Sequence, residues 1–344
     1  PAPIMKLVEV ISGLNSDAKI VSSALSLMRS WGKQAITAKD VPGFIVNRVA
    51  RPFYAEGWRA LEEGVGDAAT LDFIYRDLAG FRMGPFELGD LIGHDINTAA
   101  AQSVYDSYFG KTRFRPSLMQ NQLVAAGLLG RKTGRGVYPY TDGCDKPEPV
   151  FAKPAKTGAI TFGPETNRLQ ILCKNPLSDP NIETGFSEVD GVLIGMHRGK
   201  SAAALSQHYG QPIALLDWFA HGQTQSLAYS ASSDQADAAV RGWIAEMGKK
   251  PIRLGDRPGG VIMRTCLQLL NAAADALRDQ VGNLQDIDTA MRYGVNYPFG
   301  PFEWAKTLGY ETAVKALEHM AVETGEPEFY APNHVLKALA WSIV

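Results

Sequence analysis

Runs of apolar residues divide the chain into segments with different expected secondary structure. Residues 6–12 form a strand-like run, and the apolar positions that follow it have helical spacing, namely Ile20, Val21, Ala24, Leu25 and Met28. A second short strand is expected at 35–37. From Phe44 to about Gly127 the pattern is mainly helical and predicts helices over 44–63, 68–78, 86–109 and 117–126.

The middle of the chain has a different pattern. The glycine-rich run from Gly130 to Tyr140 predicts a loop or hairpin, and the proline-containing stretch 141–158 predicts a linker. Beyond it, short strands are expected at 169–173, 191–196 and 212–217, with a helix at 200–209 before the last of these. Because this order is β-α-β, we expect a small parallel sheet. A strand at 226–230, a helix at 234–247 and a strand at 250–254 precede a second helical region from Gly260.

The two ends of the chain share residues at a constant spacing of 216 positions. The matched positions include Gly32 and Gly248, Asp40 and Asp256, Pro42-Gly43 and Pro258-Gly259, Arg48 and Arg264, Asp72 and Asp288, and Gly84-Pro85-Phe86-Glu87 and Gly300-Pro301-Phe302-Glu303. We interpret this as a duplicated unit of strand, helix, strand, turn and helical domain. The alternative is that two helical bundles merely share turn residues.

The two copies differ at two positions that suit chemistry. Asn47 of the first copy becomes Met263 in the second, and Glu9 falls near Leu227 or Ala228 once a short gap is allowed. A polar residue kept for structure alone would be equally useful in both copies. The asymmetry therefore favours a functional role for Glu9 and Asn47, with sequence drift in the second copy as the alternative.

Glu9 alternates with Met5, Leu7 and Ile11 on one face of the first strand. A carboxylate on an apolar face needs a partner or takes up a proton. Glu9 therefore either pairs with a structural arginine or lysine, or orients and charges an imidazole, as in a His–carboxylate pair.

Two further residues have both a structural and a chemical interpretation. Asn47 follows a Pro-Gly turn in the first turns of a helix, so it is either a capping amide or a neutral donor to a substrate carbonyl oxygen. Lys132 begins the run Lys132-Thr133-Gly134-Arg135-Gly136, which is either a basic turn or a backbone cradle for a phosphate. It is not a Walker loop, and no G-x-G-x-x-G follows a strand anywhere in the chain.

The composition narrows the classes of function. The 344 residues suggest two or three domains, and 45% hydrophobic with 20% charged residues is typical of a globular protein. A net charge of −2 gives no basic field for nucleic acid, and the longest apolar runs are too short to cross a membrane. Three scattered cysteines without metal-type spacing indicate a reduced cytoplasmic protein, and we predict no metal site.

Four ordered segments resemble the NAD-dependent L-3-hydroxyacyl-CoA dehydrogenase family: 5–11, 42–48, 83–88 and 131–138. The chain is most similar to the long bacterial type with two C-terminal helical domains, which acts on 3-hydroxybutyryl-CoA or, in phenylacetate degradation, 3-hydroxyadipyl-CoA. The resemblance covers nearly the whole chain and is weakest in its middle.

The resemblance implies roles for three residues. In the family a His-Phe-Phe-Asn-Pro segment leads into the first strand and its histidine is the catalytic base, of which only Pro1 is left here. Glu9 would be the carboxylate partner of that histidine, Asn47 would help to hold the substrate carbonyl, and Lys132 would reach the cofactor. Most of the Rossmann domain, and with it most of the NAD site, would precede Pro1, so we expect this chain alone to be inactive.

The implied fold is mostly α with α/β parts. Two duplicated 6-phosphogluconate-dehydrogenase-like C-terminal helical domains would be joined by a degenerate Rossmann remnant. We place the end of a Rossmann domain at 1–40, the first helical domain at 41–140, a linker at 141–158, the remnant at 159–255 and the second helical domain at 256–344.

The predicted function is oxidation of the 3-hydroxyl of an acyl-CoA to a ketone by the full-length protein, with NAD as cofactor. The second helical domain would pack on the first as an internal pseudo-dimer, and a homodimer stays open. One alternative is a non-catalytic CoA-binding or dimerisation module. Another is a dehydrogenase of the same fold that acts on other hydroxy acids.

Overall fold

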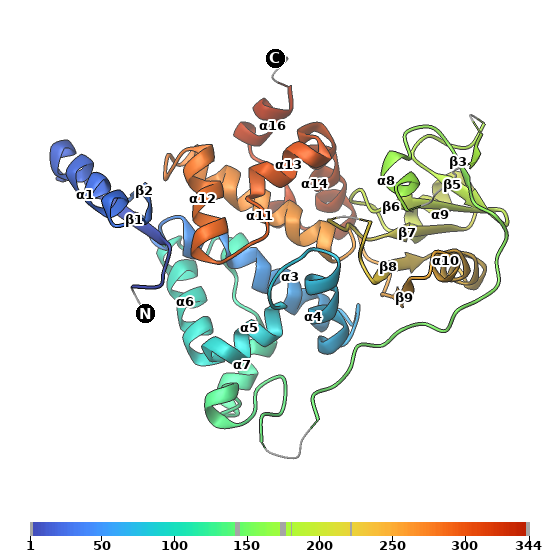
Figure 1. The fold of residues 1–344 in the computed structure, drawn as a ribbon, viewed down its shortest axis with the longest axis horizontal. Coiled ribbons are helices and arrows are strands. Elements are labelled where there is room, and N and C mark those ends of the chain that lie inside the picture. The colour runs from blue at the N-terminus through green and yellow to red at the C-terminus, as the bar shows by residue number, and fades with distance from the viewer. Residues whose placement is uncertain (1–2, 142–144, 173–176, 180, 221, 342–344) are drawn as a thin grey trace.

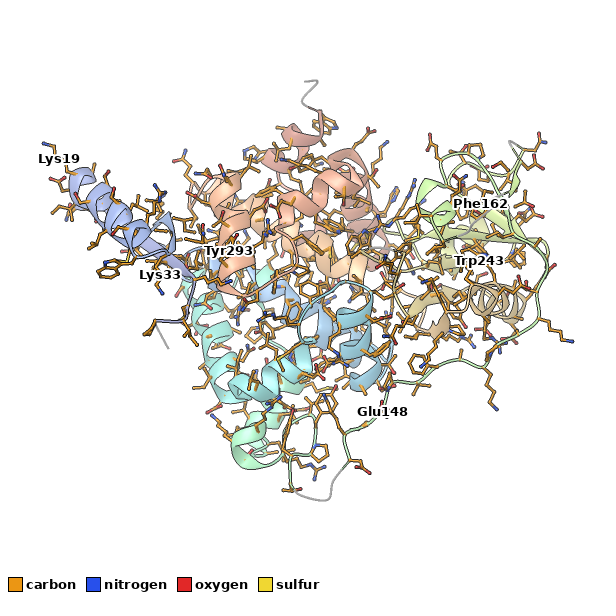
Figure 2. The ribbon with its side chains drawn as sticks, in the orientation of Figure 1. Lys19, Lys33, Glu148, Phe162, Trp243 and Tyr293 are labelled. Atoms are coloured by element: carbon orange, nitrogen blue, oxygen red, sulfur yellow. The ribbon has the colours of Figure 1, made fainter. Side chains whose placement is uncertain are left out.

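The computed structural model describes residues 3–141, 145–172, 177–179, 181–220 and 222–341. Two helical units form the body, a mixed sheet lies on one side of it, and a small β-α-β unit projects on the other side (Figure 1). Phe162 and Trp243 are buried in the sheet unit, whereas Lys19 and Lys33 belong to the projecting unit (Figure 2). None of the helices in the described ranges has the length and apolar character that a membrane span requires.

The projecting unit consists of β1 (Leu7–Ser12), α1 (Ala18–Ser30) and β2 (Gln34–Lys39). The two strands are parallel, with Glu9 opposite Ile36. No residue of α1 is buried, and its apolar Ile20 is 70% exposed. Parallel sheets are normally covered by packed helices on both faces. Because no side chain of α1 is buried, this helix adds little packing energy to the two strands.

The first helical unit follows directly. Its elements are α2 (Val46–Val49), α3 (Arg51–Glu62), α4 (Ala68–Asp77), α5 (Pro85–Ile92), α6 (His94–Ser107), the 3-10 turn η1 (Thr112–Phe114), α7 (Leu118–Ala125) and the 3-10 turn η2 (Arg131–Thr133). The helix expected at 86–109 is in fact two helices, because Gly93 has a φ of 100° and separates α5 from α6. The helix expected at 44–63 is likewise divided, at Ala50.

The Gly-Pro-Phe-Glu turn at the start of α5 has a structural role. Asp72 accepts the backbone N–H groups of Phe86 at 3.0 Å and Glu87 at 2.9 Å. A Cβ on Gly84 would lie 2.1 Å from the Asp72 carboxylate, so only glycine fits there. Asp288 accepts the corresponding groups of Phe302 and Glu303 in the second helical unit.

The central segment forms a seven-stranded sheet in the order β4-β3-β5-β6-β7-β8-β9. Its strands are β3 (Thr161–Phe162), β4 (Leu177–Ser178), β5 (Ser187–Val189), β6 (Val192–Met196), β7 (Ile213–Leu216), β8 (Ser226–Ala231) and β9 (Lys250–Arg253). The helices of this segment are α8 (Asn167–Gln170), α9 (Ala202–Tyr209) and α10 (Asp234–Glu246).

The expected β-α-β unit is present, since β6 and β7 are parallel strands joined by α9, but the expectation that the whole sheet is small and parallel was wrong. The sheet is larger and mixed: β6 and β7 are parallel, as are β8 and β9, but β7 and β8 are antiparallel. The strand expected at 169–173 is also absent, because Leu169 lies in α8, where its side chain is buried. A short apolar run suits a buried helical turn as well as a strand. Residue 173 lies outside the described ranges.

The second helical unit repeats the first. It comprises α11 (Ile262–Arg278), α12 (Leu284–Gly294), α13 (Pro301–Leu308), α14 (Tyr310–Thr324), α15 (Pro327–Tyr330) and α16 (His334–Trp341). Helices α12, α13, α14 and α16 begin 216 residues after α4, α5, α6 and α7. The same spacing relates α10 to α1 and β9 to β2.

The two helical units pack against each other, with α11 beside α3 (Figure 1). Phe81 and Tyr297, which are equivalent positions of the two units, meet edge to face with their ring centroids 4.9 Å apart. The predicted linker has neither helix nor strand in its described part, residues 145–158, and it is held to both neighbours. Val150 N–H donates to Thr70 Oγ1, and Ala152 N–H donates to the Pro251 carbonyl.

Candidate active site

The Glu9 carboxylate is hydrogen-bonded to the backbone at the amino-terminal end of α2. Its Oε1 accepts the backbone N–H of Ile45 at 2.8 Å and that of Val46 at 3.4 Å. The first N–H groups of a helix have no partner within the helix, and the helix dipole favours a negative charge there. No arginine or lysine pairs with Glu9 among the described residues, so the structural ion pair considered from the sequence is not formed.

The second oxygen of this carboxylate is open. Glu9 Oε2 has no hydrogen-bond partner in the described part of the chain, and the side chain is only partly buried. Burial raises the pKa of Glu9 above its ordinary value, although the N–H groups of Ile45 and Val46 oppose this shift. A cationic neighbour would stabilise the charged form. The carboxylate can therefore receive the N–H of an imidazole at Oε2.

Asn47 is the second residue of α2 and lies exposed. The helix is capped by Ile45 without a side-chain hydrogen bond, so Asn47 does not act as the capping amide. Its amide bonds to none of the described residues and is free to donate. The fold thus brings Glu9 and Asn47, 38 positions apart in the sequence, to the same end of one helix.

The second helical unit also has a carboxylate at the corresponding helix end, which the comparison of the two sequences did not predict. Asp217, which follows β7, accepts the N–H groups of Val261, Ile262 and Met263 at 2.8, 2.8 and 3.0 Å. Both copies therefore place a carboxylate at this helix end, from different strands. The copies differ in accessibility, since Asp217 and Met263 are each 1% exposed, whereas Asn47 is open. Helix capping alone does not distinguish Glu9, but its open oxygen and its exposed neighbour do.

Lys132 forms an exposed ion pair with Asp95, with Nζ 2.5 Å from Oδ1. In the run 132–136, the N–H groups of Thr133, Gly134 and Gly136 donate to backbone carbonyls, which does not favour a phosphate cradle. The N–H groups that follow, of Val137 and Tyr138, donate to Asp90 at 2.9 and 3.0 Å. Burial of Asp90 opposes its ionisation, yet hydrogen bonds from His94 and these N–H groups lower the pKa of Asp90. No contact joins Lys132 to Glu9 or Asn47 in the described chain, so its role at the cofactor stays a prediction.

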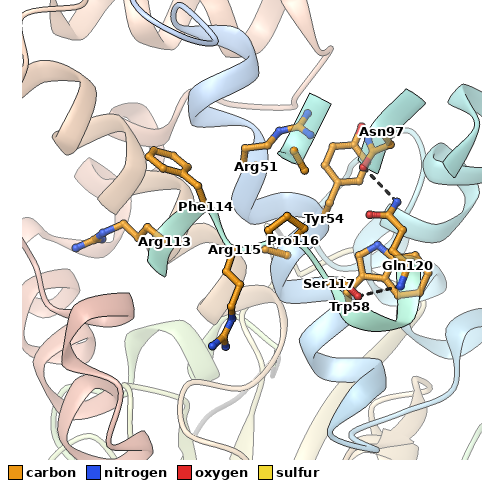
Figure 3. Close-up of a pocket in the computed structure, with 12 residues that line it drawn as sticks. Arg51, Tyr54, Trp58, Asn97, Arg113, Phe114, Arg115, Pro116, Ser117 and Gln120 are labelled. Carbon is orange, nitrogen blue, oxygen red and sulfur yellow. Dashed lines mark hydrogen bonds between the residues drawn. The ribbon is translucent and has the colours of Figure 1, made fainter. Parts of the chain in front are cut away.

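Arg51 is a residue that the sequence reasoning missed. It lies one helical turn after Asn47 and is only 8% exposed, yet its Nε and Nη1 bond to nothing among the described residues. It lines a cavity between α3, α6 and the segment 113–120 (Figure 3). One sequence signal could have identified it. At the spacing of 216, Arg51 corresponds to Leu267, so a charged residue of the first unit stands where the second has an apolar one.

The described residues do not form a dinucleotide cradle. The turn from β1 to α1 reads Gly13-Leu14-Asn15-Ser16 and lacks the glycine-rich fingerprint that binds a pyrophosphate. Within the described ranges, no histidine contacts Glu9, and no group of three metal-ligating side chains occurs.

Comparison with known families identifies the class of protein. A profile of the 3-hydroxyacyl-CoA dehydrogenase C-terminal domain matches residues 43–140 and 259–342, and the NAD-binding domain profile matches residues 1–41. The chain belongs to the 3-hydroxyacyl-CoA dehydrogenase family. One C-terminal domain profile matches both helical units, which agrees with their shared element bounds.

Individual relatives within this family have similar sequences and structures. The chain is 40% identical over 340 residues to an Escherichia coli 3-hydroxyadipyl-CoA dehydrogenase, covering 99% of this chain and 68% of that protein. A crystal structure of E. coli 3-hydroxybutyryl-CoA dehydrogenase superposes with a TM-score of 0.87 at 38% identity, with the same coverage of both chains. A probable 3-hydroxybutyryl-CoA dehydrogenase of Bacillus subtilis is 37% identical over 142 residues, 41% of this chain and 49% of that protein.

The domain profiles and the relatives support some of the expectations from the sequence and leave others without support. Membership of this dehydrogenase family and use of NAD are supported by the domain profiles and by the relatives. The comparisons give no support to the expectation that most of the Rossmann domain and the NAD site are missing. They also do not support the expectation that this chain alone is inactive, which stays a prediction.

Proposed function

We propose that this protein is an NAD-dependent L-3-hydroxyacyl-CoA dehydrogenase, which oxidises the 3-hydroxyl of an acyl-CoA to a ketone in the cytoplasm. The observation that supports this most directly is the meeting of Glu9 and Asn47 at the beginning of α2. One group can carry a charge beside an imidazole, and the other can donate to a carbonyl oxygen. The E. coli relatives are named for 3-hydroxyadipyl-CoA and 3-hydroxybutyryl-CoA, so we propose these as the candidate substrates.

Glu9 is proposed to orient and charge the histidine base that the family resemblance implies. Removal of the 3-hydroxyl proton turns an imidazole into an imidazolium, and a carboxylate within hydrogen-bond reach stabilises that cation. Oε1 is held by the Ile45 N–H, which leaves Oε2 to accept the N–H of the imidazole. General-base catalysis typically accounts for about 10²–10⁴-fold in rate.

Asn47 is proposed to donate its amide N–H to the substrate carbonyl oxygen. A donor fixed on a helix needs little reorganisation when charge develops on that oxygen. Because the amide bonds to none of the described residues, no internal hydrogen bond has to break when substrate binds. Lys132 is proposed to reach the cofactor, which requires its exposed ion pair with Asp95 to open.

The second helical unit is proposed to be catalytically silent and to serve as an internal partner of the first. Met263 replaces Asn47 and is buried. Arg48 pairs with Asp279 of the second unit, and Arg264 pairs with Glu63 of the first. Reciprocal contacts of this kind are typical of a two-fold interface between identical subunits. We therefore propose an internal pseudo-dimer and leave further association as a homodimer open.

The proposal is tested with the natural protein from its complete reading frame. We expect NADH to form from NAD and L-3-hydroxybutyryl-CoA or 3-hydroxyadipyl-CoA, and acetoacetyl-CoA and NADH each to raise the melting temperature. The rival, a CoA-binding or dimerisation module, predicts a thermal shift with acetoacetyl-CoA but none with NADH, and no turnover. That second set of results would exclude the dehydrogenase.

A further inference from the structure

Arg51 is a buried cation without an anion. Its side chain is 8% exposed, Nε and Nη1 have no hydrogen-bond partner, and no carboxylate in the described part of the chain pairs with it. The nearest compensation is the ring of Tyr54, whose centroid lies 5.1 Å from the guanidinium carbon. Burial lowers the pKa of Arg51, with the phenols of Tyr54 and Tyr297 opposing the shift. Buried charges in proteins are normally paired, so we expect the Arg51 guanidinium to bind an anionic group of a ligand.

A cavity adjoins this guanidinium. Arg51, Tyr54 and Trp58 line one side of it from α3, and Asn97 lines it from α6. Figure 3 shows Arg51 at one end of the cavity and Trp58 with Ser117 at the other. About 20 Å³ of the cavity is open to the centre of a water molecule, which is room for one small polar group such as a water molecule or a carboxylate oxygen.

Other cations of the cavity already have partners. Arg113 Nη2 donates to the Ala331 carbonyl at 2.6 Å, and Arg113 Nε lies 3.3 Å from Asp275. Arg115 is half exposed and lies 3.6 Å from Glu326. Arg113 Nη1 also lacks a hydrogen-bond partner, but the Arg113 charge is paired with Asp275. Arg51 is therefore the buried arginine of this cavity whose charge has no carboxylate partner among the described residues.

The spacing between Asn47 and Arg51 fits a short acyl chain with a charged end. Asn47 lies in α2 and Arg51 begins α3, and Ala50 between the two helices keeps a right-handed helical backbone, so the two residues are separated by about one helical turn, roughly 6 Å of rise. In a six-carbon 3-hydroxy dicarboxylic acyl group, three carbon–carbon bonds separate C3 from the terminal carboxyl carbon, a span of about 4 Å when extended. A hydrogen bond of about 3 Å to the guanidinium completes the distance.

The second helical unit provides an internal comparison. At a spacing of 216, Arg51 corresponds to Leu267 and Tyr54 to Leu270, and both leucines are buried. The same position in the helical scaffold therefore accepts an apolar side chain. The packing of the fold does not demand an arginine here, which favours a role in binding.

We propose that Arg51 is a specificity-determining residue that binds the terminal carboxylate of a 3-hydroxy dicarboxylic acyl-CoA. This inference rests on the proposed function and names its substrate class. A guanidinium offers two parallel N–H groups to a carboxylate, the geometry of the strongest ion pairs in proteins. A monocarboxylic acyl chain would leave the guanidinium buried and unpaired, so the site disfavours it.

The test compares two substrates with identical CoA phosphates and six-carbon chains, 3-hydroxyadipyl-CoA and 3-hydroxyhexanoyl-CoA, on the natural protein. We expect the wild type to prefer 3-hydroxyadipyl-CoA by about tenfold or more in kcat/KM. Arg51→Leu, which introduces the residue found at position 267, should lower kcat/KM for 3-hydroxyadipyl-CoA roughly 10- to 100-fold, mainly through KM. The same variant should change 3-hydroxyhexanoyl-CoA less than about threefold. Arg51→Lys should recover part of the preference.

Calorimetric titration with adipyl-CoA and hexanoyl-CoA, which lack the hydroxyl, tests binding without turnover. We expect Arg51→Leu to weaken adipyl-CoA alone, while Arg82→Leu, an exposed arginine of the same helical unit, changes neither. Equal losses for both ligands in a folded Arg51 variant, or equal binding of both by the wild type, would overturn the inference. A wild type that binds adipyl-CoA through Arg51 but turns over neither substrate would contradict the proposed dehydrogenase and leave the carboxylate site standing.

Discussion

Arg48 and Arg264 lie 216 residues apart, and each reaches a carboxylate of the other helical unit. Arg48 pairs with Asp279, and Arg264 Nη1 lies 3.3 Å from Glu63 Oε2. The two carboxylates are themselves 216 residues apart. Both arginines are nearly fully buried, at 1% and 2% exposure. The contacts between the helical units are therefore reciprocal, and each interfacial change has a counterpart in the other copy.

Loss of Arg264 should destabilise the contact between the units. Its Nε lies 2.6 Å from Glu56 Oε2, and Glu56 is 1% exposed, so Arg264→Met would leave a buried carboxylate uncompensated. We expect the free energy of unfolding to fall by about 3–5 kcal/mol, measured by chemical denaturation. The exposed Lys315–Glu311 pair supplies the control, since Lys315→Met should not change stability measurably. A similar small effect for both variants would contradict this account of the interface.

The partner carboxylate Asp279 predicts a pH dependence. Although burial opposes its ionisation, hydrogen bonds from Arg278 and Arg48 lower the pKa of Asp279 to about 2. A carboxyl whose pKa is lowered by folding stabilises the protein above its unfolded pKa of about 4, and this stability is lost as the pH falls toward 2. Since Asp279 is about one-third exposed, solvent screening reduces the effect to about 1 kcal/mol. The stability difference between wild type and Asp279→Asn should shrink across that window, and a constant difference would refute the assignment.

Asn47→Met converts the proposed donor into the residue found at the equivalent position of the second helical unit, which we propose to be catalytically silent. We expect kcat to fall by about 10²-fold, because one preoriented donor to the substrate carbonyl is removed. The free energy of unfolding should change by less than about 0.5 kcal/mol, since the side chain is exposed. Met263→Leu, at the equivalent buried position, is the matched control and should retain the wild-type rate. Full activity of the Asn47 variant would remove this residue from the site.

Lys132→Met tests the proposed contact with the cofactor. A charge-assisted hydrogen bond contributes about 1.5–3 kcal/mol, so we expect KM for NAD to rise by about tenfold or more, with KM for the acyl-CoA unchanged. Asp95→Asn is the control, because it releases the Lys132 amine from its ion pair without removing it. A KM for NAD that is unaffected in the Lys132 variant would leave this lysine with a surface role only.

Local patterns predicted the helical units well. The spacing of 216 and the glycine and proline turns predicted the order of the helices. Gly-Pro-Phe-Glu begins both α5 and α13, and an equivalent aspartate, Asp72 or Asp288, accepts the N–H groups of each helix start. The break at Gly93 was missed, since a glycine within an apolar periodic run does not by itself show a positive φ. The mixed sheet was missed because strand direction depends on pairing partners that are distant in the sequence.

The candidate site was predictable only in part. Glu9 and Asn47 could be named from pattern and resemblance, but their shared place at α2 depends on the tertiary packing of β1 on the helical unit. Asp217 takes the corresponding position in the second copy from a different strand, so no residue-by-residue comparison could find it. Arg51 was recognisable only once burial showed that its charge has no partner.

The central claim is that the Glu9 charge serves the chemistry beyond its contact with α2. Glu9→Gln keeps an oxygen for the Ile45 N–H, so the fold should survive, with a change of about 1 kcal/mol or less in the free energy of unfolding.

The measurement that tests this claim most directly compares kcat/KM of Glu9→Gln with that of Asp217→Asn, its counterpart at α11, in the natural protein. We predict a loss of about 10²–10⁴-fold for the Glu9 variant. The Asp217 variant should stay within about threefold of the wild type. Wild-type activity in a folded Glu9→Gln protein, or equal losses in both variants, would contradict the account and leave Glu9 as a helix cap.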